Sequence, residues 1–256
     1  MKLSRCSPDG SDVLVFLTHE HHDHYEGTPQ LLQRFPKAMM LVHEGIQQRL
    51  FDIQGAPGKL WPLAAPASTH EDASRAELGP CIRIGEPGTP SSFLHLAGGK
   101  GHTSSHTCLF LPSPHEVLLA GDHVVGYGSA VLDPESGSIA EYLATTQYLI
   151  DLSPRIALPA HGRPLLQPIP VLRHYYKHRL AREEAILAAV HQLASHGSAS
   201  APVTVTMAGI VAVVYATTPK ELWPAAQRNV RLHVLKLMEE GRIDAGAAVC
   251  LDVVKI

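Results

Sequence analysis

Four histidines and two acids directly after a strand-like apolar segment are the feature that most restricts how this chain can fold. The segment Val13–Leu17 has the length and unbroken apolar character of a buried strand in an α/β sheet. It is followed by Thr18-His19-Glu20-His21-His22-Asp23-His24. Ligand sites of α/β folds lie beyond the carboxyl ends of strands. The tract therefore predicts a functional site on an α/β scaffold.

The spacing within this tract favours metal binding. Alternation along an extended chain turns His19 and His21 to the same side, where both can hold one ion. Asp23 and His24 come one turn later and can face a second ion. Imidazole nitrogens and carboxylate oxygens suit Zn²⁺, with Fe and Mn as alternatives. A surface histidine tract that binds metal without catalysis is the competing interpretation.

Three more candidate ligands follow predicted strands, each in a polar or glycine-rich break of the sequence. His102 follows a strand expected over 93–96, Asp122 ends one expected over 117–120, and His161 follows one expected over 155–158. Because the carboxyl ends of strands gather ligands in α/β folds, we expect these side chains to join the histidine tract. This convergence favours a site over an isolated surface tract.

The motifs in order resemble the metallo-β-lactamase superfamily. They are His-x-His-x-Asp-His from His19, Gly101-His102-Thr103, Gly121-Asp122 and Pro159-Ala160-His161-Gly162. The resemblance implies an αββα sandwich with its site at one edge of the two sheets. It also implies two divalent metal ions, one held by His19, His21 and His102, the other by Asp23, His24 and His161, with Asp122 as the bridge.

A narrower resemblance is to the branch of β-lactamase-like protein 2, in its plant and algal form. It rests on residues 121–133, the helix after them, Arg182-Glu183-Glu184 and residues 226–233. It implies that a winged-helix-like tail follows the hydrolase domain. Animal members of this branch are described as endoribonucleases that act on single-stranded RNA, so the resemblance implies a possible RNA substrate.

The predicted fold class is α/β, an αββα metallo-β-lactamase sandwich that is short at its N-terminus, followed by a small helical winged-helix-like domain. We expect the hydrolase domain over 1–165, with an Ala/Pro-rich insertion over about 54–90 that interrupts the regular pattern and loops out. We expect a linker over 164–170 and the second domain over 171–256, with Trp223 and Leu232 in its core. Helices are predicted over 28–34 (with Thr28 as N-cap), 44–51, 139–152, 172–195, 207–215 and 219–240, and a hairpin over 243–254.

Several other residues lie near the predicted ligands in the sequence. Tyr127 and Ser129 lie in a Gly-rich loop after Asp122 and are placed to contact substrate. We expect His22 and His123 to lie outside direct ligation. For His106 we prefer an ordinary loop position to a substrate contact.

The predicted chemistry is hydrolysis with two metal ions, most simply Zn²⁺, which make a nucleophile from water near neutral pH. Asp122 bridges the ions and Asp23 orients the hydroxide, so these are the predicted catalytic residues. The substrate is a hydrolysable small molecule or single-stranded RNA. The alternatives are a thioester hydrolase resembling glyoxalase II and a non-catalytic protein that binds metal and nucleic acid.

Charge and cysteine content constrain partners and compartment only weakly. Residues 171–256 carry 10 Lys and Arg against 7 Asp and Glu, and the rest of the chain carries 11 against 17. The basic balance permits nucleic-acid contact, although a solvated helix face explains it as well. The scattered cysteines and the lack of a long apolar run favour an intracellular protein of chloroplast, mitochondrion or cytoplasm, without membrane contact. The sequence does not indicate an oligomeric state.

Overall fold

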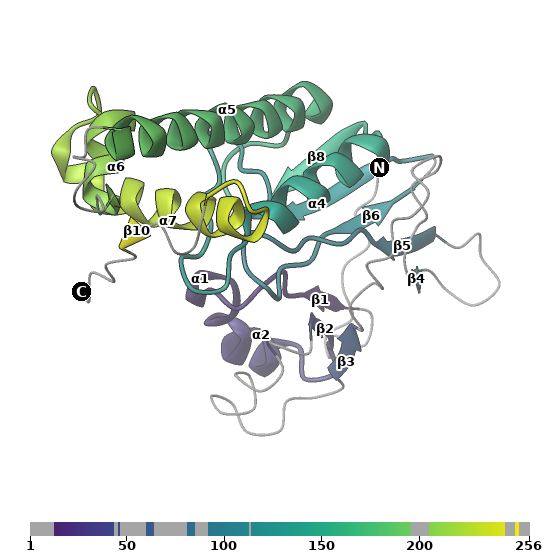
Figure 1. Ribbon diagram of the computed structural model, residues 1–256. Helices are drawn as coiled ribbons and strands as arrows, with labels where there is room; N and C mark the ends of the chain where they lie inside the picture. The colour runs from purple at the N-terminus through teal and green to yellow at the C-terminus, as the bar shows by residue number, and fades with distance from the viewer. Residues whose placement is uncertain are drawn as a thin grey trace.

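The computed structural model describes residues 13–43, 46, 60–63, 81–84, 92–112, 114–195, 205–243 and 249–250. Two β-sheets lie face to face between helices, so the predicted αββα layering is confirmed (Figure 1). The first sheet is parallel, in the order β1 (Leu14–Phe16), β2 (Met39–His43), β3 (Leu60–Leu63). The second has the order β4 (Cys81–Ile84), β5 (Ser92–Leu96), β6 (Leu109–Leu111), β7 (Val117–Gly121), β8 (Ile156–Pro159), antiparallel except for the parallel pair β7–β8.

Side-chain alternation along the strands sorts apolar residues between the layers. In and just after β1, Val15 and Leu17 pack into a cluster with Leu32 of helix α2 (Thr28–Arg34). Leu14 and Phe16 point the other way and pack between the two sheets, in a cluster that contains residues of both. The short helix α1 (His22–Tyr25) lies between β1 and α2 in the chain.

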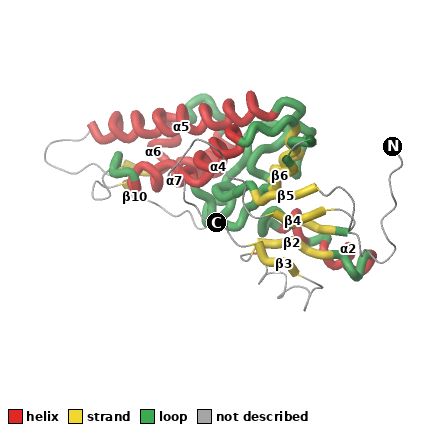
Figure 2. Tube along the Cα trace, turned by 90° about the vertical axis from the view of Figure 1, so that its right-hand side faces the viewer, coloured by secondary structure: helices red, strands yellow, loops and turns green. Residues whose placement is uncertain are grey.

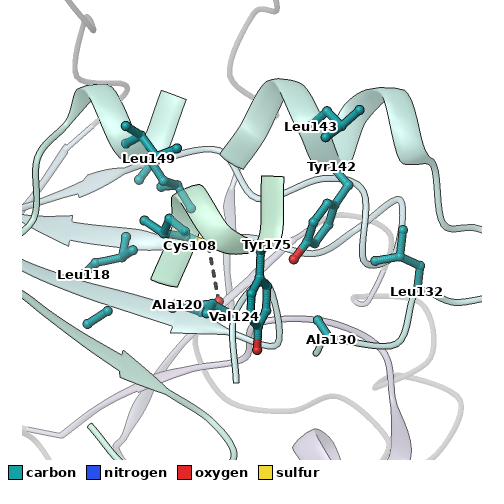
Figure 3. Packing of buried hydrophobic residues seen from close by; sticks show 14 of the residues in the cluster. Cys108, Leu118, Ala120, Val124, Ala130, Leu132, Tyr142, Leu143, Leu149 and Tyr175 are labelled. Atoms are coloured by element: carbon teal, nitrogen blue, oxygen red, sulfur yellow. Dashed lines mark hydrogen bonds between the residues drawn. The ribbon is translucent and has the colours of Figure 1, made fainter. Parts of the chain in front are cut away.

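The outer face of the second sheet is covered by α4 (Ile139–Asp151) and the first half of α5 (Pro168–Ser195). Figure 3 shows this cluster, which contains Leu118 of β7 together with Leu149 and Tyr142 of α4. The Cys108 thiol donates to the Ala120 carbonyl at 3.4 Å, and burial raises the pKa of that thiol, so it remains neutral.

A second helical unit follows. It consists of the second half of α5, α6 (Met207–Val214), a 3₁₀ turn (Lys220–Leu222), α7 (Trp223–Glu239) and the two-residue strands β9 (Val205–Thr206) and β10 (Val249–Cys250). Figure 2 shows α5, α6 and α7 grouped together, away from the first sheet. Among the described residues, no helix is both long enough and apolar enough to cross a membrane.

The predicted insertion over about 54–90 contributes two strands, which corrects the expectation of a loop there. β3 pairs with β2 and β4 pairs with β5, so both are edge strands. Pro62 in β3 is compatible with this position, because an edge strand does not need every backbone N–H. The remainder of the insertion, and most of the helix predicted over 44–51, lie outside the described residues.

The predicted linker over 164–170 is also corrected. Leu165 forms a bridge with Ala157, and α5 begins at Pro168, where a missing N–H costs nothing because first-turn N–H groups have no partner in the helix. Leu232 of α7 packs in the cluster of the second sheet, not in the core of the second unit where we expected it; Trp223 does pack against that core.

At the element ends, one expectation is wrong and another is only partly covered by the described residues. The N-cap of α2 is Gly27, and Thr28 is already helical, with its hydroxyl donating to the Tyr25 carbonyl at 2.5 Å. Of the predicted C-terminal hairpin the structure describes Val249 and Cys250, which form β10 and pair in parallel with β9, with Val249 opposite Val205; most of the hairpin lies outside the described residues.

Candidate metal centre

The structure brings all seven predicted ligands together at one edge of the two sheets. His19 and His21 follow β1, and Asp23 and His24 lie in α1. The others come from the breaks after β5, β7 and β8, and they are His102, Asp122 and His161. These side chains meet because the segments that follow β1, β5, β7 and β8 leave their sheets at the same edge.

The first group consists of His19, His21 and His102. His19 Nε2 lies 2.9 Å from His21 Nδ1, and His102 Nε2 lies 3.2 Å from both of those nitrogens. Corners of a tetrahedron around Zn²⁺ with Zn–N bonds of about 2.0–2.1 Å are about 3.3 Å apart. The three nitrogens therefore have the spacing that one cation would impose on them.

The second group consists of Asp23, His24 and His161. His161 Nε2 lies 3.1 Å from Asp23 Oδ2 and 3.2 Å from His24 Nε2. His24 Nε2 is 3.6 Å from the same carboxylate oxygen. The side chain of Asp23 is 60% exposed, so this group opens to solvent on the Asp23 side.

Asp122 lies between the two groups. Its Oδ2 is 3.5 Å from His161 Nε2, 3.6 Å from His24 Nε2 and 3.8 Å from His102 Nε2. Its other oxygen is buried and accepts no hydrogen bond from the residues that the structure describes. Burial alone would raise the pKa of Asp122, but the hydrogen bond and charge of His24 outweigh burial and lower it, so the carboxylate is ionised. An anion placed this way suits a bridge between two cations.

The protonation states of the histidines also fit metal binding. Burial lowers the pKa of His102 to about 4 and lowers that of His19 well below its usual range. Both rings are therefore neutral at pH 7 and present a lone pair, which ligation requires. Neutral imidazoles together with a carboxylate are donors that Zn²⁺ takes in proteins, so the donor set fits a divalent metal.

Contacts on the far side of the rings hold the histidines in place. The Thr18 hydroxyl lies 3.0 Å from His19 Nδ1 and 3.2 Å from His24 Nδ1, so one side chain orients two candidate ligands. Asp133 Oδ2 lies 3.4 Å from His21 Nε2. Burial alone would raise the pKa of Asp133, but the backbone N–H groups of residues 136 and 135 lower it. Such partners orient metal ligands and raise their basicity.

His106 supports the site instead of contacting substrate or lying in an ordinary loop. It is buried, its Nδ1 is 2.9 Å from the Gly99 carbonyl, and its Nε2 accepts the backbone N–H of Asp122 at 2.9 Å. Burial lowers its pKa, so the ring is neutral and both bonds are compatible with one tautomer. His106 therefore fixes the backbone of the central carboxylate.

Replacing His106 by alanine is expected to lower the free energy of unfolding by about 2 kcal/mol, because two buried backbone groups lose their partner. Metal affinity is expected to fall roughly tenfold, the usual effect of removing an outer partner of a ligand. Urea denaturation and metal titration would measure both effects. His115→Ala, at an exposed position, serves as the control. Equal results for the two variants would contradict this role.

Glu20 is a second supporting residue that the sequence did not single out. Its Oε2 accepts hydrogen bonds from the hydroxyls of Thr103, at 2.8 Å, and Ser105. These bonds tie the loop that carries His102 to the histidine tract. The available signal was alternation, which places Glu20 on the opposite side of the chain from its two histidine neighbours.

The remaining candidate histidines lie outside the two groups, as expected. His22 is exposed, and its Nδ1 is 3.2 Å from Glu26 Oε1. His123 is buried, stacks on Tyr142 and bonds to the Thr146 hydroxyl at 2.8 Å.

A pocket of about 390 Å³ opens beside the candidate ligands. Its wall combines His21, Asp122 and His161 with most of the segment 125–134, which we call the pocket loop. Tyr127 and Ser129 both line it, and the side chain of Tyr127 is 69% exposed. Their predicted position beside the site is therefore correct.

Two adjoining groups of imidazole and carboxylate ligands at the edge of an αββα sandwich define a protein of the metallo-β-lactamase class. The sequence comparison agrees, since residues 13–161 match the family model described as the metallo-beta-lactamase superfamily. The chain belongs to this superfamily. Residues 206–248 match a second model, the beta-lactamase associated winged helix domain, so the predicted combination of the two domains is confirmed.

Curated relatives support the predicted branch. The chain is 28% identical over 229 residues to the beta-lactamase-like protein 2 homolog of Drosophila melanogaster, covering 90% of this chain and 69% of the relative. It is 28% identical over 234 residues to the lactamase-like protein nscB of Trichophyton rubrum, covering 90% of this chain and 62% of the relative. The chain thus spans about two thirds or less of these relatives.

Solved structures agree on the fold. A beta-lactamase domain protein from Burkholderia ambifaria superimposes with a TM-score of 0.64 at 19% identity, covering 90% of this chain and 70% of the other. A metallo-beta-lactamase family protein from Thermus thermophilus gives a TM-score of 0.58 at 21% identity, covering 90% and 75%. At these identities the likeness concerns architecture alone.

Proposed function

We propose that this chain is a hydrolase that uses two divalent cations, most simply Zn²⁺, to cleave phosphodiester bonds in single-stranded RNA. The observation that carries the proposal is the position of Asp122 between two three-ligand groups. His19, His21 and His102 would hold one ion, and Asp23, His24 and His161 the other. Bound there, two divalent ions would act as Lewis acids and supply a nucleophile from water near neutral pH.

The chain's own side chains have separable roles in this proposal. Asp122 balances the charge of both groups from a buried position, and His106 keeps its backbone in place. Asp23 is exposed beside His161, and in this proposal it would orient the attacking water and accept its proton. Asp133 and Thr18 keep the imidazoles oriented, so that the ligand set needs little rearrangement during reaction.

The proposed RNA substrate rests on the second unit and on the resemblance. Residues 206–248 match a winged-helix domain, and residues 171–256 contain 10 Lys and Arg against 7 Asp and Glu. The branch that the sequence resembles includes endoribonucleases. We further propose that the hydrolase domain spans residues 1–165 and the winged-helix-like domain residues 171–256.

A comparison of three substrates, each offered to the purified chain, tests this function. The chain would be stripped with a chelator, reconstituted with Zn²⁺ or Mn²⁺, and offered labelled single-stranded RNA, the matching duplex and an acyl-glutathione thioester. We expect cleavage of single-stranded RNA that depends on the added ion. Turnover of the thioester without RNA cleavage would replace the substrate with that of a glyoxalase II-like enzyme. Salt-sensitive RNA binding without cleavage would favour the non-catalytic alternative.

Tyr127 gives a sharper prediction about the RNA substrate. Its exposed ring lies against the backbone next to His161, since a Cβ on Gly162 would come within 2.7 Å of Tyr127 Cδ1. Stacking of a base on an aromatic ring contributes about 1–3 kcal/mol. Tyr127→Ala is therefore expected to raise KM for RNA about 5- to 150-fold, with kcat nearly unchanged.

Tyr127→Phe is the matched variant, because it keeps the ring and removes only the hydroxyl. It is expected to retain the KM of the parent. Steady-state kinetics on a short labelled oligonucleotide would measure both variants. A KM for Tyr127→Ala within twofold of the parent would show that no base stacks on this ring.

A further inference from the structure

The pocket loop has no regular secondary structure of its own. It belongs to the segment between β7 and α4, residues 122–138, in which no helix or strand is formed. Its two ends are tied to the candidate ligand loops. Gly126 N–H donates to the His161 carbonyl and Asp133 N–H to the His102 carbonyl, both at 2.8 Å.

Three side chains of α5 and α7 donate hydrogen bonds to backbone carbonyls of the pocket loop. The Tyr175 hydroxyl donates to the Gly128 carbonyl at 2.5 Å. Arg179 Nη2 donates to the Ala130 carbonyl at 2.5 Å, and Arg231 Nη1 donates to the Pro134 carbonyl at 2.8 Å. The bonds are spread over the loop, between and beyond its two tied ends.

The donors are themselves fixed in position. Arg179 is buried, its guanidinium lies 5.1 Å from the ring centre of Tyr142, and its Nη1 donates to the Asn229 side chain of α7 at 3.3 Å. Figure 3 shows Tyr142 and Tyr175 within the cluster under the second sheet, close to Ala130 of the loop. Charged donors make the stronger hydrogen bonds, so the two arginines are effective anchors.

We infer that the C-terminal helices set the shape of the substrate pocket, with Tyr175, Arg179 and Arg231 as positioning residues that hold the pocket loop. The second unit is then part of the construction of the active site as well as a candidate nucleic-acid-binding module. This assigns a role to the segment 226–233, because Arg231 holds the pocket loop directly and Asn229 holds Arg179. We call Tyr175, Arg179, Asn229 and Arg231 together the bracket. The inference depends on the proposed function only for the identity of the substrate.

Hydrogen exchange in the full-length chain tests the bracket directly. Tyr175→Phe removes one hydroxyl and keeps the buried ring, and Arg231→Met removes the donor and keeps the stem. In both variants, peptides that cover the pocket loop are expected to exchange about three- to tenfold faster, the effect of losing one net hydrogen bond. The matched controls are Tyr215→Phe and Arg228→Met, which lie in the same helical unit and should leave the loop unchanged.

Kinetics supply the second readout. The two bracket variants are expected to raise KM about three- to tenfold, while kcat and metal content per chain stay within about twofold of the parent. Unchanged exchange in the pocket loop of both variants would overturn the inference. So would faster exchange spread over the whole second unit, because that would indicate general destabilisation. If RNA is not cleaved at all, the proposed substrate fails while the exchange result still decides the bracket.

Discussion

Replacement of Asp122 by alanine is expected to remove bound metal and to lower hydrolytic activity by at least about 100-fold. Changing an outer partner of a metal ligand already costs about 10–100-fold, and Asp122 is a candidate ligand shared by both groups. Its loss would leave five imidazoles, which carry no negative charge, and one exposed carboxylate, Asp23. A single negative charge would then face two divalent cations. The second ion should be the more weakly held.

Elemental mass spectrometry on the purified chain measures this directly. The parent is expected to carry about two metal ions per chain, and the Asp122→Ala variant fewer than one. Asp151→Ala, an exposed acid at the end of α4, is the control and should match the parent. Asp122→Asn keeps the shape without the charge and should fall between the two. Metal content that is equal in parent and Asp122→Ala would exclude Asp122 as a ligand.

Strand ends made the candidate site predictable from sequence. Each predicted ligand follows an apolar segment that forms a strand within one or two residues of the expected bounds, as for His161 after β8. The periodicity of a strand and its abrupt polar end are local signals, and the convergence of strand ends at a sheet edge is a general rule. Local signals were therefore sufficient to predict that four separate segments of the chain would bring their candidate ligands together.

The supporting contacts could not be predicted in the same way. His106 bonds to a carbonyl seven residues before it and to an N–H sixteen residues after it, and only the folded loops bring these groups together. Leu232 is indistinguishable by helical spacing from its neighbours in α7, yet the docking of that helix buries it under the second sheet. β3 and β4 are short segments in an Ala/Pro-rich region, and only their pairing with β2 and β5 in the folded sheets defines them.

Replacement of Glu183 by alanine is expected to lower the free energy of unfolding by about 3 kcal/mol. Glu183 is buried, and its Oε1 accepts from Lys236 Nζ at 2.9 Å and from Arg242 Nη1 at 3.2 Å. Breaking a buried ion pair costs about 3–5 kcal/mol, and the lower end applies because Lys236 keeps Glu240 at 2.7 Å. The nearby His233 cannot supply the lost negative charge, because an imidazole is either neutral or positively charged.

Glu184→Ala is the matched control for this prediction. Glu184 adjoins Glu183 on α5 and pairs with the same Arg242, at 2.8 Å, but its side chain is 66% exposed. Exposed pairs contribute about 0–1 kcal/mol, so this variant should stay close to the parent in urea denaturation. Similar losses in the free energy of unfolding for the two variants would mean that the burial of Glu183 does not determine how much its ion pairs stabilise the fold.

The same variant tests whether the two proposed domains unfold separately. The sequence has two tryptophans, Trp61 in β3 and Trp223 at the start of α7, so Trp61→Phe or Trp223→Phe isolates a fluorescent probe for each part. α5 contributes to both cores, and Leu232 joins α7 to the core under the second sheet. We therefore expect Glu183→Ala to lower the urea midpoint reported by both probes. A shift in the Trp223 signal alone would show that the two domains unfold independently despite the shared helix.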